Sequence, residues 1–303
     1  FGMKHLDGLA QIDDAEVVAL VGVPRDQAEG VAAERGIGWV TDSLDEVLAS
    51  DAVDAVILAT PTPLHAAQAL ACLDAGKHVE IEIPLCDVLA DGEAVAAKAA
   101  DTGLVAMVGH TRRFNPSHQW VRRRIVAGEM AIQHMDVQTF FLRRSNLNAL
   151  GQPRSWTDHL LWHHAAHTVD LFQYQTGGEI VAAHAIAGPT HPELGIAMDL
   201  SIQLKASTGA ILTLALSFNI DGPFGTFFRY IGDHGTYVAR YDDLVDGYDD
   251  PIDVSGVAVS TNGIELQDRE FVAAITEGRQ PNAAAADVLG CYRVLDQLER
   301  QLG

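Results

Sequence analysis

Residues 156–170 form the segment of this chain whose side chains are best suited to chemistry. The segment contains four histidines and two aspartates. His163, His167 and Asp170 share one face if the segment is helical, because residues three and four apart lie on the same side of an α-helix. Imidazole is the side chain that most readily transfers protons near neutral pH. This face is therefore the first place to look for a general base.

Two other uses of these histidines stay open. Histidines four residues apart can bind zinc, but the glutamate of the H-E-x-x-H motif is absent between His163 and His167. A histidine can also be a structural residue whose ring is hydrogen-bonded inside the protein. We expect no metal site, and the rest of the chain favours catalysis over structure.

The composition limits the classes to which the protein can belong. The chain has 303 residues, 48% of them apolar, which is enough for two domains with cores of their own. Its formal net charge of −21 repels nucleic acid and anionic membranes, so neither is an expected partner. No apolar run is long enough to span a bilayer. An anionic small-molecule substrate would need a local cationic pocket.

The cysteines indicate a reducing compartment. Cys72, Cys86 and Cys291 are the three cysteines of the chain, and no two of them form a C-x-x-C pair. This pattern excludes a disulfide scaffold and is typical of a protein in the cytoplasm, where we expect this one to be.

The first 112 residues alternate between strand and helix signals. Short apolar runs predict strands, and the segments between them have helical patterns that end at glycines or before prolines. Such alternation predicts right-handed βαβ units and a parallel sheet, so we expect a dinucleotide-binding Rossmann domain over residues 1–112. The predicted strands are 16–22, 52–60, 77–83 and 104–109, and the predicted helices are 25–35, 64–75 and 87–100.

The beginning of the chain departs from the usual order of such a domain. A Rossmann domain begins with a strand, followed by G-x-G-x-x-G at the start of a helix. Here a helix-like segment, 3–11, comes first, and Gly2 stands where the third glycine would fall. We expect that the first strand is missing and that about ten residues precede Phe1 in the natural protein.

The second half, residues 113–303, has strands in succession with few helices between them. Thr208-Gly209 and His234-Gly235 are typical of hairpin turns. We expect an α+β domain with an open, mainly antiparallel sheet, and we interpret 242–250 as an acidic solvated loop. The predicted strands are 135–143, 180–188, 197–205, 210–219, 226–232 and 236–240. Helices are predicted at 267–276 and 285–301, the last a candidate to pack back on the first domain.

Several motifs, taken in order, resemble the Gfo/Idh/MocA oxidoreductases over essentially the whole chain. They are Ala59-Thr60-Pro61 with His65, Ala75-Gly76-Lys77-His78-Val79 with Glu82-Ile83-Pro84, Arg112-Arg113-Phe114-Asn115-Pro116, His163-x-Ala165-x-His167-x-x-Asp170, and Phe271 with Ile275 and Gly278. The resemblance implies a nicotinamide-dependent dehydrogenase that uses an open antiparallel sheet for subunit contacts, so we expect a homodimer.

Two departures from the usual family pattern narrow the activity. The common Glu-Lys-Pro is Glu82-Ile83-Pro84 here, and the common Asp-x-Gly-x-His is His163-x-Ala165-x-His167. Sugar oxidation assisted by that lysine cannot be carried over. The resemblance at these positions favours oxidation of a semialdehyde that carries carboxylates, through its cyclic hemiacetal to a lactone. The alternatives are a sugar or cyclitol dehydrogenase, a nucleotide-binding sensor without activity, and a metal-dependent hydrolase.

The cofactor is expected to be NADP, with NAD as the alternative. An NAD-selective site places an acid at the tip of the second strand, where it binds the ribose 2′-hydroxyl. No acid precedes Asp26 at that tip, and Arg25 is suited to attract a 2′-phosphate. The resemblance implies that Thr60, Pro61, His65 and Glu82 bind the cofactor. The glycine motif and the strand tip add Gly2 and Arg25 to these residues.

With Ile83 in place of the family lysine, we assign His167 as the base that takes the hydroxyl proton. We expect His163 to act as its partner or relay and Asp170 to orient His167 or an adjacent backbone group. Guanidinium groups bind carboxylates in a planar, two-point geometry. Arg154 is the preferred clamp, and the other candidates for substrate binding are Arg112, Arg113, Arg143, Arg144 and His164.

Overall fold

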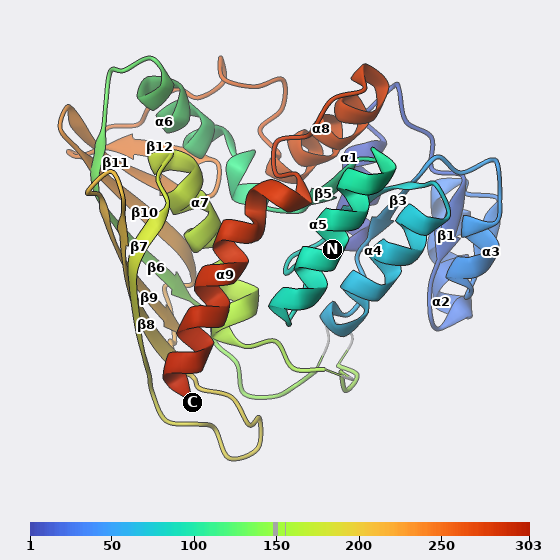
Figure 1. The fold of residues 1–303 in the computed structure, drawn as a ribbon, viewed down its shortest axis with the longest axis horizontal. Helices are drawn as coiled ribbons and strands as arrows, with labels where there is room; N and C mark the ends of the chain where they lie inside the picture. The colour runs from blue at the N-terminus through green and yellow to red at the C-terminus, as the bar shows by residue number, and fades with distance from the viewer. Residues whose placement is uncertain (148–150, 155) are drawn as a thin grey trace.

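The molecule has one half built from short parallel strands and helices, and another built on a single large sheet (Figure 1). The computed structural model describes residues 1–147, 151–154 and 156–303. The dinucleotide-binding domain that the sequence predicts at the N-terminus and the mainly antiparallel sheet in the second half are both present. The division after residue 112, like the strand expected before Phe1, stays a prediction.

Five parallel strands form two small sheets in the first half. One sheet has the order β3-β4-β5 and the other pairs β1 with β2. Three of the four residues of β4 are buried, as expected for a strand covered on both faces. The sequence prediction missed β2, because three residues are too few to show a period. The strands are β1 (Ala19–Val21), β2 (Trp39–Thr41), β3 (Ala55–Leu58), β4 (His78–Ile81) and β5 (Ala106–Val108).

The helices of this half follow the predicted pattern closely. α2 and α5 end at Gly36 and Gly103, whose φ angles of 72° and 70° favour glycine. The short helix α3 was not predicted. No helix among the described residues is long and apolar enough to cross a membrane. The helices and 3₁₀ turns are α1 (Gly2–Leu9), α2 (Arg25–Arg35), α3 (Leu44–Leu48), η1 (Thr62–Leu64), α4 (His65–Asp74), α5 (Leu89–Thr102) and η2 (Thr111–Arg113).

The sheet of the second half has seven strands in the order β12-β11-β10-β6-β9-β8-β7. All neighbours are antiparallel except β6 and β9. The interpretation of 242–250 as a loop was wrong in part, because β12 pairs with β11 and buries Leu244. The strands are β6 (Ile132–Phe140), β7 (Ile180–Ala187), β8 (Asp199–Ala206), β9 (Ile211–Ser217), β10 (Gly225–Gly232), β11 (Gly235–Arg240) and β12 (Asp243–Asp246).

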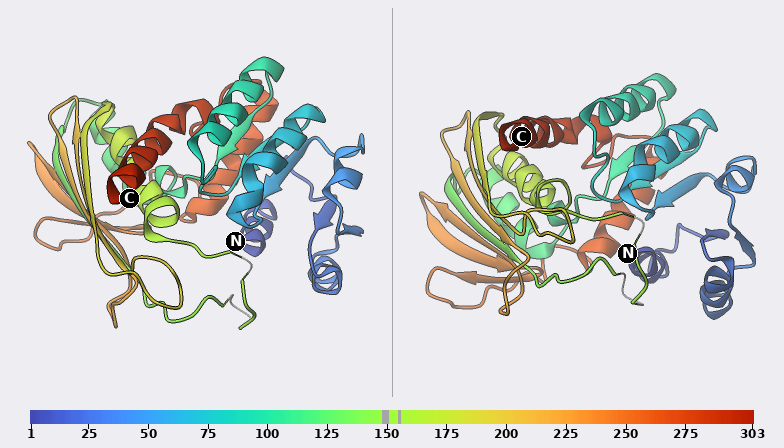
Figure 2. Two further views of the ribbon diagram at one scale, coloured as in Figure 1. Left: turned by 60° about the horizontal axis from the view of Figure 1, so that its bottom comes forward. Right: turned by 90° about the horizontal axis from the view of Figure 1, so that it is seen from below.

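Helices cover one face of this sheet and leave the other open (Figure 2). The alternation in β8 shows why, since Leu200, Ile202 and Leu204 are buried on the covered face while the residues between them are exposed. The histidine segment does not form a continuous α-helix but begins with a π-helical turn, η3. The covering elements are α6 (Pro116–Val126), η3 (Leu160–Ala165), α7 (Ala166–Thr176) and α9 (Ala285–Leu302).

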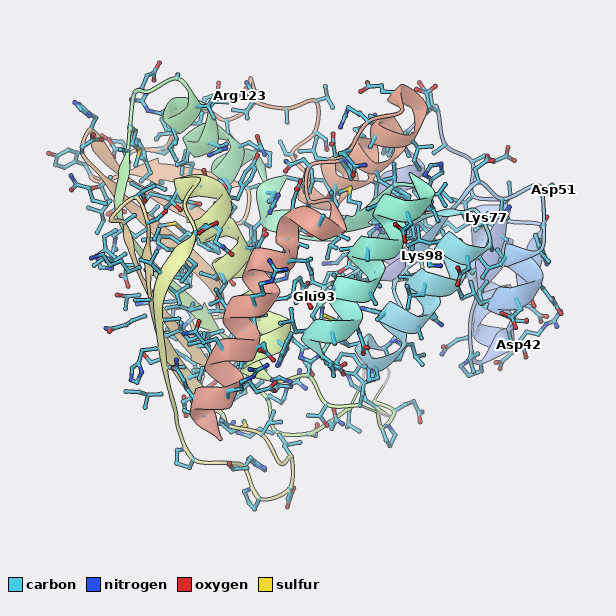
Figure 3. All side chains as sticks on the ribbon, viewed as in Figure 1. Asp42, Asp51, Lys77, Glu93, Lys98 and Arg123 are labelled. Carbon is cyan, nitrogen blue, oxygen red and sulfur yellow. The ribbon has the colours of Figure 1, made fainter. Side chains whose placement is uncertain are left out.

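The C-terminal helix α9 lies between the two halves and contacts α5, α7 and β7. The backbone N–H of Leu85 donates to the hydroxyl of the fully buried Tyr292 at 2.7 Å. Glu93 of α5, labelled in Figure 3, accepts from Arg293 of α9 at 3.0 Å. The helix α8 (Gly263–Glu277) packs on α1. Both halves are thus held by residues from the end of the chain.

Replacing Tyr292 with phenylalanine should lower the free energy of unfolding by about 1–3 kcal/mol, because the Leu85 N–H would be buried without an acceptor. Urea denaturation measures the loss. The control is Tyr248→Phe at a side chain that is 89% exposed, which should change stability by less than about 0.5 kcal/mol. Equal losses in the two variants would contradict the role of this hydrogen bond.

Candidate active site

The candidate site lies at the carboxyl ends of β3, β4 and β5, where ligands bind in open parallel sheets. Backbone hydrogen bonds tie the loops after these strands together: the N–H of Glu82 donates to Leu58 O at 2.9 Å, and that of Gly109 donates to Ile81 O at 2.7 Å. The segment η3 from the second half reaches this edge, since His163 lies 3.2 Å from the Thr62 hydroxyl. The residues that the sequence predicts for the site therefore meet at this edge, and the following contacts show what each of them does there.

His65 connects two of these loops from below the surface. Its Nδ1 lies 2.8 Å from the carbonyl oxygen of Pro84, its Nε2 lies 2.8 Å from that of Thr60, and its ring is 1% exposed. The prediction that His65 lies along the cofactor ribose does not agree with this burial. Its role in this geometry is to fix the shape of the loops that carry Thr60 and Pro61.

Three positions in the first half bear on the binding of a dinucleotide. A Cβ atom on Gly22, just after β1, would lie 2.8 Å from that of Ala28, so chain and helix approach as closely as only glycine allows. Gly2 is the first residue of α1, and the nearest atom to a Cβ placed there is 3.9 Å away. Arg25 begins α2, is largely exposed and donates to Glu29 at 3.0 Å. These features fit a dinucleotide cofactor.

His110, which sequence reasoning missed, is the fully buried residue that follows β5. Its Nδ1 lies 3.5 Å from Asp170 Oδ2, and its Nε2 lies 3.4 Å from the Tyr292 hydroxyl. Burial lowers the pKa of His110 to about 4, so the ring is neutral. At its distance from Asp170 the Nδ1 forms no hydrogen bond, so one buried ring nitrogen of His110 has no partner among the described residues. Its place directly after a strand was the signal that could have identified it.

Asp170 forms a buried two-point ion pair with Arg113, with distances of 2.8 and 2.6 Å. Burial raises the pKa of Asp170, but the charge and hydrogen bonds of Arg113 lower it below its usual value. Among the described residues no hydrogen bond joins Asp170 to His167, so the predicted orienting contact was wrong. The guanidinium of Arg113 is likewise used within the chain, with Asn282 as a further partner at 3.2 Å.

His163 is held on both sides of its ring. Its Nδ1 accepts from the His159 N–H at 3.1 Å, its Nε2 is shared with Thr62, and Trp156 stacks on it with ring centroids 5.2 Å apart. Burial is the main cause that lowers its pKa to about 3. The expected relay from His163 to His167 is therefore not formed. The π-helical turn removes the regular spacing on which that expectation relied.

His167 is the histidine of the segment that keeps an unused ring nitrogen. Its buried Nδ1 has no hydrogen-bond partner in the part of the chain that the structure describes. The ring meets that of His110 edge to face, with centroids 6.4 Å apart. Burial first, and then the positive charge of Arg112, hold the pKa of His167 well below its ordinary value. The imidazole is thus neutral and able to accept a proton.

Arg112 is an arginine of this site that forms no ion pair with a carboxylate in the part of the chain that the structure describes. Its guanidinium lies over the ring of Tyr241, 4.9 Å from the centroid, and donates weakly to Asn115 at 3.4 Å. Its buried Nε has no partner. A half-buried guanidinium without an ion-pair partner among the described residues is well suited to an anionic ligand.

The other predicted clamps gather around Asp158. Arg154 lies 2.9 Å and His164 3.4 Å from its carboxylate, and Arg143 forms an ion pair with it as well. Burial raises the pKa of Asp158, but these partners outweigh it and hold the pKa well below its usual range. Arg144 instead donates to the carbonyl oxygens of Phe218 and Asn219. The preferred clamp, Arg154, thus already has a counter-ion.

Family models match both halves of the chain. Residues 1–110 match the oxidoreductase family with an NAD-binding Rossmann fold, named for Gfo, Idh and MocA, and residues 116–258 match the C-terminal domain of bacterial oxidoreductases. The chain is 67% identical over 302 residues to 4-carboxy-2-hydroxymuconate-6-semialdehyde dehydrogenase of Sphingobium sp. (strain NBRC 103272 / SYK-6), covering 100% of this chain and 96% of that protein. This chain belongs to the Gfo/Idh/MocA oxidoreductases. The family resemblance drawn from the sequence is confirmed.

Solved Gfo/Idh/MocA-like structures share the fold at lower identity. UDP-N-acetylglucosamine 3-dehydrogenase of Acidithiobacillus ferrooxidans superposes with a TM-score of 0.83 at 22% identity, covering 100% of this chain and 94% of that one. Levoglucosan dehydrogenase, in a complex with NADH and levoglucosan, gives a TM-score of 0.85 at 21% identity, covering 99% of this chain and 94% of that one. At such identities the likeness shows the shared fold alone.

Replacing Asp170 with asparagine should destabilise the protein by about 3–5 kcal/mol, because the Arg113 charge would be left buried and unpaired. Since the folded pKa of Asp170 is lowered, its contribution is present above the ordinary carboxyl pKa and is lost as pH falls through the folded value. Urea denaturation should therefore show a constant difference between pH 5 and 8 that shrinks below about pH 4.

The matched control is Asp136→Asn. Asp136 pairs with Arg229 at 3.5 Å on the surface, so its loss should cost less than about 1 kcal/mol. A comparable cost for both variants would show that the buried ion pair has no special weight.

Proposed function

We propose that this chain is an NADP-dependent dehydrogenase of 4-carboxy-2-hydroxymuconate-6-semialdehyde. It oxidises the cyclic hemiacetal of this compound to the lactone 2-pyrone-4,6-dicarboxylate, in the bacterial 4,5-cleavage pathway for protocatechuate and lignin-derived aromatics. The observation that carries the proposal is His167, whose buried Nδ1 has no partner, beside Arg112, which forms no ion pair with any described residue. The name of the Sphingobium relative supports the choice of substrate.

Oxidation removes a hydride from the hemiacetal carbon and a proton from its hydroxyl oxygen. The bound nicotinamide supplies the acceptor for the hydride. His167 accepts the hydroxyl proton, which lets the carbon–oxygen double bond of the lactone form. Burial and Arg112 keep His167 a weak base in the free protein. A substrate carboxylate on Arg112 offsets that positive charge and so raises the pKa of His167, which couples substrate binding to proton transfer.

Arg112 is our first choice for the group that binds a substrate carboxylate. Arg143, Arg154 and His164 share the single carboxylate of Asp158, so this cluster keeps a surplus of positive charge for a second anionic group. We assign it a weaker contribution, since Asp158 competes with the substrate. Arg113 and Arg144 position neighbouring groups and are not expected to touch the substrate.

Residues 1–112 form the cofactor half in this proposal and 113–303 the substrate half. Gly2 at the start of α1, Thr60 and Pro61 after β3, and Glu82 after β4 would line the cofactor. NADP is preferred over NAD because the tip of β1 carries no acid that would repel a 2′-phosphate, whereas Arg25 is exposed there and attracts it.

We also propose a homodimer that forms through the open face of the large sheet. This face exposes Val181, Ile186 and Ile211, and a hollow of about 550 Å³ lies over β7, β8 and β9. Exposed apolar side chains on an open sheet favour burial against a partner. The three cysteines are free and buried, in keeping with a place in the cytoplasm. Sedimentation of the purified protein measures the oligomeric state.

The decisive experiment follows the absorbance band of NADPH with freshly ring-cleaved protocatechuate as substrate. Rapid growth of the band with NADP, slower growth with NAD, and no reaction of myo-inositol or glucose are expected. A flat trace from a protein that binds NADP would refute the proposed substrate. Faster turnover with NAD would refute the cofactor preference alone.

His167→Ala should lower kcat by about a hundredfold or more, because proton removal would lose its base. Binding of NADP should change little, since the cofactor lies on the first half. The control His234→Ala changes a ring that is 73% exposed and should keep normal turnover. Near-normal turnover of the His167 variant would remove His167 as the base.

Arg112→Ala should raise the KM for the substrate by about ten- to a hundredfold, the cost of losing a hydrogen-bonded charge partner. Arg154→Ala should raise it less, by about tenfold or under, because Asp158 already engages that side chain. Initial rates at saturating NADP measure both. A larger effect at Arg154 would return the main clamp to that residue.

A further inference from the structure

A buried cluster of four ionisable side chains lies beside the site, and three of the four have no role in the function proposed above. We call it the His5 cluster: His5 of α1, Glu80 and Glu82 at β4 and its carboxyl end, and Asp268 of α8. Each of the four residues is less than a tenth exposed. Three carboxylates in the interior need positive charge or protons nearby, since burying an unpaired charge is costly.

The geometry identifies the charge state of His5. Its Nδ1 lies 2.7 Å from Asp268 Oδ1, and its Nε2 lies 2.8 Å from Glu82 Oε1. When Asp268 and Glu82 are both ionised, their oxygens only accept, so both ring nitrogens carry hydrogen and the ring is an imidazolium. Burial lowers the pKa of His5, but the hydrogen bonds to Asp268 and Glu82 outweigh it and raise the pKa to about 10.

Glu80 completes the cluster from within β4. It accepts from Gln267 at 2.7 Å and, like Asp268, has a buried carboxylate oxygen with no hydrogen-bond partner among the described residues. Burial and the nearby charge of Asp268 raise its pKa to about 8. A proton on Glu80 therefore leaves the cluster with one imidazolium facing two carboxylates.

A metal ion is the competing interpretation. Single ligand atoms of His5, Glu80 and Asp268 lie within 4.8 Å of one another. A metal, however, would need a ring nitrogen of His5 that carries no proton, and both nitrogens are already hydrogen-bonded to carboxylates. The observed contacts favour protons over a metal.

The cluster connects three elements that shape the cofactor site. His5 is on α1, three residues after Gly2, and Glu82 follows β4 at the edge where the cofactor would lie. The charge of Glu82 reaches His110. A Cβ on Gly8 would lie 2.6 Å from Asp268 Oδ2, so α1 and α8 are in close contact at this point. Movement of His5 would therefore release Glu82 and loosen α1 from α8.

We propose that His5 is a positioning residue of the dehydrogenase site, whose imidazolium fixes the Glu82 carboxylate between α1 and α8. This inference rests on the proposed function for its effect on turnover, but not for its effect on the charge state or on cofactor binding. The groups that face His5 are Glu80 and Glu82 from β4 and its end, and Asp268 from α8. The Glu82 side chain is thereby held in one orientation at the mouth of the nicotinamide site.

The test is a double-mutant cycle with His5→Gln, Glu82→Gln and the variant that carries both. His5→Gln should lower kcat/KM by about tenfold and weaken NADPH binding by about tenfold. In the Glu82→Gln background, the same change should lower both quantities by less than about twofold, because the carboxylate that His5 positions is absent. NADPH fluorescence gives the affinity without turnover. Equal costs in both backgrounds, or no cost in either, would overturn the proposal.

His78→Gln is the matched control. His78 is the first residue of β4, and its ring accepts a hydrogen bond from the Val105 N–H at 2.9 Å. It should lower the unfolding midpoint but leave kcat/KM and NADPH affinity within about twofold. A tenfold loss in this variant would mean that general destabilisation explains the His5 result.

A measurement on the wild-type protein guards against a His5 variant that does not fold. ¹⁵N NMR of the histidine rings, with the His5 signals assigned, should show that the His5 ring is still an imidazolium at pH 8.5. A neutral His5 ring at that pH would overturn the proposal. Metal analysis that found one divalent ion per chain would also overturn it in favour of the metal site. Absence of turnover on the proposed substrate, with these binding and NMR results intact, would refute the substrate alone.

Discussion

The ion pair between Arg113 and Asp170 is the interaction on which the arrangement of the site depends. It joins η2, which follows β5, to α7 on the large sheet, and so fixes the two halves at the point where they meet. Asp170 also lies 3.5 Å from the ring of His110. Because the pair is buried and satisfied at two points, it leaves little freedom to the residues around it. The distance between His167 and the strand ends is set in this way.

The same pair explains why two adjacent arginines have different roles. In a 3₁₀ turn successive side chains point about 120° apart. Arg113 therefore faces Asp170 while Arg112 faces Tyr241 and the space near His167. In a chain with a net charge of −21, a cation without a carboxylate partner at such a place stands out. The surplus of acid elsewhere does not cancel it, because no described carboxylate forms an ion pair with Arg112.

Local signals in the sequence predicted most of the fold. Apolar runs marked β3 and β4, and Gly36 and Gly103 marked the ends of two helices, because each of these signals acts within a few residues. The three-residue strand β2 and the acidic strand β12 were missed, since pairing with a distant neighbour, not their own pattern, makes them strands. In the site, the strand ends and the histidine segment were predicted. The partners of His65, Arg154 and Asp170 were not, because each lies on another element whose position follows only from tertiary packing.

The place of β6 in the sheet has a consequence for synthesis of the chain. Its neighbours β9 and β10 both come more than seventy residues later, and the β6–β9 pair is parallel. During translation β6 therefore leaves the ribosome with both edges unpaired and must wait for residues 211–232. Unpaired edges bind other strands readily, and distant pairing slows folding. Nascent chains of this protein are thus expected to depend on chaperones until β10 has emerged, whereas the first half can begin to form its parallel strands at once.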